Sequence, residues 1–96
     1  MRDLIKMALA GVTIKVMPED VEVDRAALKS KIEGKIKEGY GDVGEIKFEE
    51  EPIAFGLVAL KFTFIIDEAK GTDMVDDWKV EGASDISVID FRRALG

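Results

Sequence analysis

Hydrophobic and polar residues alternate early in the chain in a pattern that predicts a β-strand. Between Ala10 and Met17, every second position is a β-branched apolar residue: Val12, Ile14 and Val16. A period of two with branched side chains is typical of a strand that buries one face. Pro18 lacks a backbone N–H, so we expect the strand to end there.

The spacing then becomes helical. Leu28, Ile32 and Ile36 repeat every four residues, which places them in one stripe along a helix. Asp24 precedes this stripe, and its carboxylate is suited to accept hydrogen bonds from the first free N–H groups. Gly39 is the expected helix end.

The centre of the chain predicts a hairpin. Ile46 and Phe48 alternate with charged residues in a short strand, which the run from Glu49 to Pro52 interrupts. A longer strand follows from Leu57 to Ile66. One of its faces is entirely apolar and is expected to be the core side; it consists of Val58, Leu60, Phe62, Phe64 and Ile66.

The last part of the chain predicts a short helix and a final strand. Thr72 is a candidate N-cap, and Gly82 the expected helix end. Helical spacing relates Met74, Val75 and Trp78, and we interpret the lone Trp as a core residue. The final strand carries Ile86, Val88 and Phe91.

The predicted order of elements is therefore βαββαβ. It is the order of the α+β ferredoxin-like sandwich, with a four-stranded antiparallel sheet and two helices on one face. The 96 residues are expected to form one domain, 1–96. Because this fold hosts many unrelated functions, function has to come from a site.

Composition excludes several kinds of site. The chain has no cysteine and no histidine, so it can form no disulfide and no Cys/His nucleophilic or zinc-thiolate site. It also has no G-x-S-x-G or P-loop motif. We therefore expect a protein that is not an enzyme, with no cofactor and no metal site.

Charge and hydropathy bear on partners and location. The net charge of −6 argues against direct nucleic-acid binding, which needs clustered Lys and Arg. We interpret the lysines between Lys29 and Lys37 as a solvated helix face, because no aromatic residues are interleaved with them. No stretch is long enough to span a membrane, and no targeting segment is evident. The expected location is the cytoplasm.

One segment does not fit its context. Five residues between the two hairpin strands are partly apolar, although connections are normally polar; they are Pro52, Ile53, Ala54, Phe55 and Gly56. Two interpretations are open. The apolar side chains plug the core under the sheet edge, or Phe55 is presented as an anchor for a pocket in a protein partner. Ile53 in the core with Phe55 exposed is a combination of the two.

Three stretches resemble archaeal elongation factor 1-beta, a family of guanine-nucleotide exchange factors. They are Ile14-Lys15-Val16-Met17-Pro18-Glu19, the run from Glu50 to Leu60, and the tail Asp90-Phe91-Arg92-Arg93. The resemblance covers nearly the whole chain, and Met1 to Ala10 is longer than is usual in the family. It implies that the chain promotes GDP release from elongation factor 1-alpha, the GTPase that carries aminoacyl-tRNA to the ribosome.

The resemblance also implies roles for residues. A loop aromatic matching Phe55 packs on the GTPase in eukaryotic relatives, and a lysine near the carboxyl end approaches its magnesium site. No lysine follows Asp90 here, so Arg92 and Arg93 are the candidate cations. A solvated strand end is the competing interpretation of these arginines. The alternative function is a ferredoxin-like regulatory or ligand-sensing module, dimeric through its open sheet face.

Overall fold

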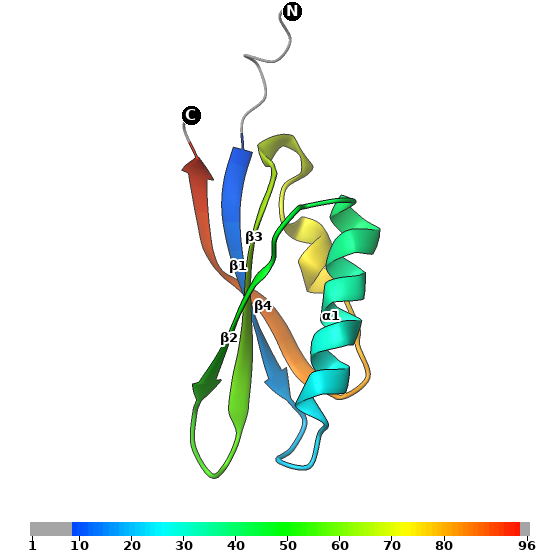
Figure 1. Cartoon of the computed structure of the whole chain (residues 1–96), viewed down its shortest axis with the longest axis vertical. Helices are drawn as coiled ribbons and strands as arrows, with labels where there is room; N and C mark the ends of the chain where they lie inside the picture. The colour runs from blue at the N-terminus through cyan, green and yellow to red at the C-terminus, as the bar shows by residue number, and fades with distance from the viewer. Residues whose placement is uncertain (1–8, 95–96) are drawn as a thin grey trace, which may run out of the picture.

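The computed structural model describes residues 9–94, which form one antiparallel sheet with a helix across one face (Figure 1). The strands are β1 (Leu9–Pro18), β2 (Lys47–Pro52), β3 (Val58–Asp67) and β4 (Ala83–Ala94), in the order β2-β3-β1-β4. The helix is α1 (Arg25–Tyr40). The predicted α+β class and the four-stranded antiparallel sheet are thereby confirmed.

The core lies between the sheet and α1, as the alternating pattern predicts. Pairing of β1 with β3 sets Val12 opposite Phe64 and Ile14 opposite Phe62, so that these side chains share a face. All four are buried. The apolar stripe of the helix closes the other side of the same cluster; it consists of Leu28, Ile32 and Ile36.

The helix begins where predicted but ends two residues later. Asp24 Oδ1 accepts hydrogen bonds from the N–H groups of Ala26 at 3.0 Å and Ala27 at 3.2 Å. The prediction that Gly39 ends the helix is wrong, because Gly41, with a φ of 80°, takes that role. Gly39 lies inside the helix, where a β-carbon would come within 3.2 Å of Trp78 Cζ2. A hydrogen at this position lets the indole pack against the helix.

The predicted second α-helix is also wrong. The segment contains two 3₁₀ turns, η2 (Glu68–Lys70) and η3 (Asp73–Asp77). The side chain of Thr72 makes no capping hydrogen bond, and Trp78 is already extended, with φ of −69° and ψ of 130°. So short a segment gains too few hydrogen bonds to offset the cost of helix nucleation. Only one α-helix therefore covers the sheet within residues 9–94.

Tyr40 ties the end of α1 to this segment. Its hydroxyl donates a hydrogen bond to the carbonyl oxygen of Gly71 at 2.7 Å. Its ring lies 5.7 Å from that of Phe64 and meets Trp78 edge-on at 6.2 Å, between centroids. Burial raises the pKa of Tyr40 above its ordinary value of 10.0, and the Asp73 carboxylate adds to this increase. Trp78 packs against the core, as expected of a lone Trp.

Two strands are longer than predicted. β2 continues through the glutamate run to Pro52, because Glu49, Glu50 and Glu51 pair with β3 along its edge. β4 continues past Phe91, with register shifts opposite Thr13/Ile14 and Met17/Pro18 of β1. The first shift leaves Ile89 without a partner in β1. It also changes which face each later residue of β4 occupies.

Candidate functional site

The five-residue segment Pro52–Gly56 forms the tip of the β2–β3 hairpin. The N–H of Ile53 donates to the carbonyl oxygen of Leu57 at 2.9 Å, and the N–H of Leu57 donates to that of Ala54 at 2.9 Å. Between them, Phe55 and Gly56 have φ values of 56° and 81°. Two consecutive residues with positive φ are the requirement of a type I′ hairpin turn.

Phe55 is the most unusual residue of this turn. It is the only non-glycine residue with a positive φ among those that the structure describes. The left-handed conformation costs an L-residue with a β-carbon about 1–2 kcal/mol. The side chain gains no compensating burial, since it is 95% exposed. A bulky apolar residue that is both strained and solvated indicates a role outside the fold itself.

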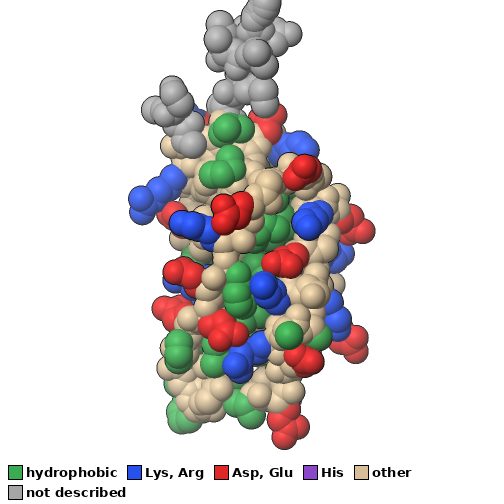
Figure 2. Space-filling view, viewed as in Figure 1, with side chains coloured by type: hydrophobic (Ala, Val, Ile, Leu, Met, Phe, Trp, Pro, Cys, Tyr) green, Lys and Arg blue, Asp and Glu red, His purple; other side chains and the backbone are tan. Residues whose placement is uncertain are grey.

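The structure rejects the interpretation of the segment as a core plug. Phe55 is almost fully exposed, and Ile53 is 43% exposed, so neither contributes a buried side chain. Figure 2 shows hydrophobic side chains at the end of the molecule where the hairpin lies, below a surface of mixed acidic and basic groups. The tip is therefore free to contact another molecule.

Ion pairs hold the hairpin against the rest of the domain. Arg25 Nε, at the start of α1, lies 3.1 Å from Glu50 Oε2 on the helix side of β2. On the opposite face, Lys15 Nζ of β1 lies 3.7 Å from Glu51 Oε1. As expected for consecutive strand residues, these carboxylates point to opposite faces and do not converge. The glutamate run is thus an anchored edge strand and not an acid/base pair.

The tail arginines point to opposite faces of β4. Arg92 pairs with Gly11 in the β1 ladder and Arg93 with Ala10, so only Arg93 lies on the helix side. Arg93 forms an ion pair with Glu68 of η2. Arg92 Nε lies 3.2 Å from Asp90 Oδ2, and its side chain is 82% exposed. Of the two, Arg92 is the less restrained cation.

The structure does not bring the hairpin tip and the tail together. In the register of the sheet, Val58 lies beside the tip, whereas Ile65 pairs with Gly11, the partner of Arg92. The stretch of β3 from Val58 to Ile65 spans roughly 25 Å at the usual rise per strand residue. Figure 1 shows the hairpin at the lower end of the sheet and the end of β4 at the upper end. The candidate residues therefore form two separate sites.

Sequence reasoning missed one residue beside the tip. Val21, in the connection between β1 and α1, is 56% exposed. A β-carbon placed on Gly56 would lie 3.3 Å from Val21 Cγ1, so the two loops touch. A single exposed valine is ordinary on a protein surface, and no sequence signal distinguishes it.

The open face of the sheet lacks the features of a nucleic-acid platform. Its central positions are occupied by Thr13, Lys15, Lys61 and Thr63, and the two threonine hydroxyls are hydrogen-bonded to each other at 3.0 Å. Phe91 pairs with Val12 and so belongs to the helix side. Along the described strands, no aromatic side chain occupies this face.

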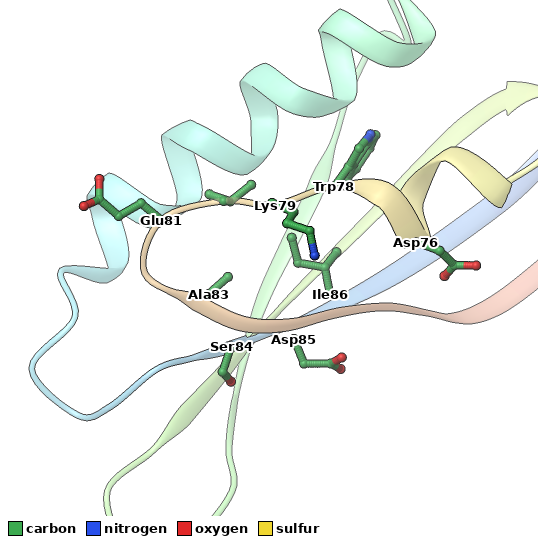
Figure 3. Close-up of a pocket in the computed structure, with 9 residues that line it drawn as sticks. Asp76, Trp78, Lys79, Glu81, Ala83, Ser84, Asp85 and Ile86 are labelled. Atoms are coloured by element: carbon green, nitrogen blue, oxygen red, sulfur yellow. The ribbon is translucent and has the colours of Figure 1, made fainter.

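A hollow lies beside β4 (Figure 3). Lys79 and Ile86 approach each other across it, whereas Glu81 points away. Its walls combine single charges of both signs with apolar atoms and include no buried charged side chain. Within residues 9–94, no three His, Cys, Asp or Glu side chains are grouped to hold a metal ion, and no helix could cross a membrane.

Comparison with known proteins identifies the family. Residues 11–93 match the model of the EF-1 guanine nucleotide exchange domain, a range that includes Phe55 and both tail arginines. The chain is 46% identical over 87 residues to elongation factor 1-beta of Methanothermobacter thermautotrophicus, covering 86% of this chain and 93% of that protein.

Two further relatives have the same name. Elongation factor 1-beta of Methanosarcina barkeri is 46% identical over 83 residues, covering 83% of this chain and 91% of the relative. That of Aeropyrum pernix is 37% identical over 91 residues, covering 91% and 98%. The stretch Met1 to Ala10 precedes the family match, and residues 1–8 lie outside the described part of the chain. The chain therefore belongs to the EF-1 guanine nucleotide exchange domain family and is a nucleotide exchange factor, not an enzyme.

Proposed function

We propose that the chain promotes release of GDP from the translational GTPase elongation factor 1-alpha in the cytoplasm, with the hairpin tip as its anchor. The observation that supports Phe55 as the anchor is that its side chain is 95% exposed while its backbone is in the left-handed conformation. Aromatic side chains that insert into a partner's pocket supply a large share of binding energy. Phe55 is buried only when the partner binds, so its side chain contributes to the affinity for the partner and not to the stability of the fold.

The tail is the second contact of this proposal. Arg92 presents a mostly exposed guanidinium, held by Asp90 of the same strand. Guanidinium groups bind carboxylates and phosphates through paired hydrogen bonds. We assign Arg92 the role of the cation that acts near the phosphate and magnesium site of the GTPase. Arg93 supports it from the helix side through its pair with Glu68.

The distance between the hairpin tip and the tail determines how the chain would contact the GTPase. A partner that meets both sites presents a contact surface longer than roughly 25 Å, the length of β3 between them. The hairpin then supplies affinity at one end while the tail disturbs the nucleotide site at the other. A protein that prefers the nucleotide-free GTPase lowers the affinity of the GTPase for GDP. By thermodynamic linkage, GDP lowers the affinity of the GTPase for that protein by the same ratio.

Charge supports the encounter. The net charge of −6 favours a basic surface on the partner and increases the rate of association with it. The glutamates of β2 contribute, although Glu50 and Glu51 are partly neutralised by their ion pairs. The rate of association is therefore expected to fall as salt concentration rises.

The direct test is GDP release. Elongation factor 1-alpha loaded with a fluorescent GDP analogue is mixed with excess unlabelled GDP, with and without the chain. We expect stoichiometric amounts of the chain to accelerate loss of fluorescence. An unchanged release rate at saturating concentration would contradict the proposed function.

A further inference from the structure

The hairpin tip does not stand alone at its end of the domain. The connection from β1 to α1, residues 19–23, lies against it through the contact between Val21 and Gly56. Figure 1 shows both connections at the lower end of the molecule. Any partner that receives Phe55 from this direction therefore also meets the β1–α1 connection.

This connection is a built turn that presents Val21 outward. Asp20 Oδ1 accepts a hydrogen bond from the N–H of Glu22 at 2.8 Å, and the Asp20 carbonyl oxygen accepts one from Val23 at 3.4 Å. The N–H of Glu19 donates to the carbonyl oxygen of Gly82 at 2.9 Å, which fixes the start of the turn to the residue just before β4. Val21 is thus held at the exposed corner of a hydrogen-bonded turn.

The charges around Val21 indicate what kind of partner surface the β1–α1 connection would contact. Val21 is flanked by three exposed carboxylates, those of Glu19, Asp20 and Glu22. Neither Glu19 nor Glu22 forms an ion pair with a described residue, in contrast to Glu50 and Glu51. An apolar centre with an acidic rim is complementary to an apolar pocket with a rim of Lys and Arg.

We propose that the β1–α1 turn is the second half of the docking surface, and that Val21 and Phe55 enter one apolar pocket rimmed by basic residues on the GTPase. This inference rests on the proposed function, because it takes the same partner. It assigns Val21 to contact and the flanking carboxylates, Glu19 and Glu22, to the rim. Asp20 instead positions Val21, since its side chain holds the turn.

The test compares matched variants in binding to the nucleotide-free GTPase. Val21→Thr keeps the shape of the side chain but adds a hydroxyl that the pocket would have to desolvate. We expect its affinity to fall about fivefold, the equivalent of roughly one buried methyl group. Ile89→Thr makes the same kind of change at an exposed position in the middle of β4, away from the hairpin tip, and is expected to leave affinity unchanged.

The rim is tested by charge. Glu19→Gln with Glu22→Gln should lower affinity at low salt and flatten its dependence on salt concentration. Glu45→Gln with Asp77→Asn removes the same charge elsewhere on the exposed surface and is the control. If both double variants change affinity and its salt dependence equally, the effect comes from net charge and not from the position of Glu19 and Glu22. That result would overturn this part of the proposal.

The outcomes separate this inference from the proposed function. If Phe55→Ala weakens binding and Val21→Thr does not, the docking surface is the hairpin alone and the inference is overturned. If neither variant weakens binding while the chain still binds, the anchor in the proposed function fails as well. Circular dichroism of Val21→Thr shows whether its fold is intact, and Val21→Ala provides a second, smaller side chain for the same measurement.

Discussion

Phe55 and Arg92 lie at opposite ends of one antiparallel sheet, separated by the length of β3 from Val58 to Ile65. If both residues contact the GTPase, as proposed, the domain reaches two distant regions of a larger protein. A rigid sheet transmits the position of one end to the other, because its strands are fixed in register by backbone hydrogen bonds. Anchoring at Phe55 therefore determines where Arg92 can reach.

The conformation of Phe55 predicts an opposition between stability and function. Asn tolerates the left-handed region, and Asn-Gly is the preferred pair for a type I′ turn. We expect Phe55→Asn to stabilise the domain by about 1 kcal/mol. The measurement is denaturant unfolding, and a loss of stability would show that the Phe55 ring contributes to the fold.

The two arginines of the tail should differ in their effects. Arg92→Ala is expected to slow exchange, since its side chain is 82% exposed, while stability changes little because exposed ion pairs contribute at most about 1 kcal/mol. Arg93→Ala is expected to slow exchange less, because Arg93 is already engaged with Glu68. Release of labelled GDP measures both effects. Equal rates for wild type and Arg92→Ala would remove this residue from the mechanism.

Two glycines of α1 predict opposite effects of one substitution. A β-carbon added at Gly34 would have no neighbouring atom within 4 Å, so Gly34→Ala should stabilise the helix by about 1 kcal/mol. At Gly39, the β-carbon would lie 2.7 Å from Met74 Sδ and 3.2 Å from Trp78 Cζ2. We expect Gly39→Ala to destabilise the domain by about 1 kcal/mol or more, because the indole has to move. Thermal unfolding of both variants gives the comparison, and stabilisation by both would contradict the packing of Trp78.

Tyr40 predicts a loss of stability at alkaline pH. Its pKa is raised in the folded state, so folding favours the neutral phenol over the phenolate. The resulting stabilisation is complete below the ordinary pKa of 10.0 and is lost as pH rises through the higher pKa of the folded state. Because the chain has one tyrosine, the phenolate absorbance reports this group alone. A midpoint at or below the ordinary value would contradict its burial.

The phenol also contributes through its hydrogen bond to Gly71. Tyr40→Phe removes the donor and leaves the Gly71 carbonyl oxygen unpaired within the fold. We expect a cost of about 1 kcal/mol in the free energy of unfolding. The alkaline loss of stability should be reduced in this variant, which serves as the control for the titration.

Much of the fold follows from local patterns in the sequence. The alternation of Val12, Ile14 and Val16 gives the core face of β1, and Asp24 marks the start of α1, because both depend on neighbouring residues alone. The prediction of a second helix fails because Trp78 has helical spacing with Val75 but is placed by its contact with Gly39, far away in sequence. Spacing cannot reveal such a tertiary contact.

The candidate site residues were likewise predictable from the sequence only in part. Pro52 to Gly56 stands out in the sequence as an apolar connection, yet whether Phe55 is buried or exposed depends on the φ values of the turn. Arg92 and Arg93 face opposite sides because they are consecutive in a strand, but which of them lies on the helix side depends on the shift in pairing between β4 and β1. Val21 gives no signal, because the role proposed for it comes from the position of the neighbouring loop.

The central claim is that the chain drives exchange through Phe55 presented at the hairpin tip. Its most direct test is the rate of GDP release from elongation factor 1-alpha with the wild-type chain and with Phe55→Asn, at equal concentrations. We predict that the variant remains folded, with stability at or above that of the wild type, and that its acceleration of release falls by more than about tenfold. Full acceleration by a folded Phe55→Asn chain would contradict the account.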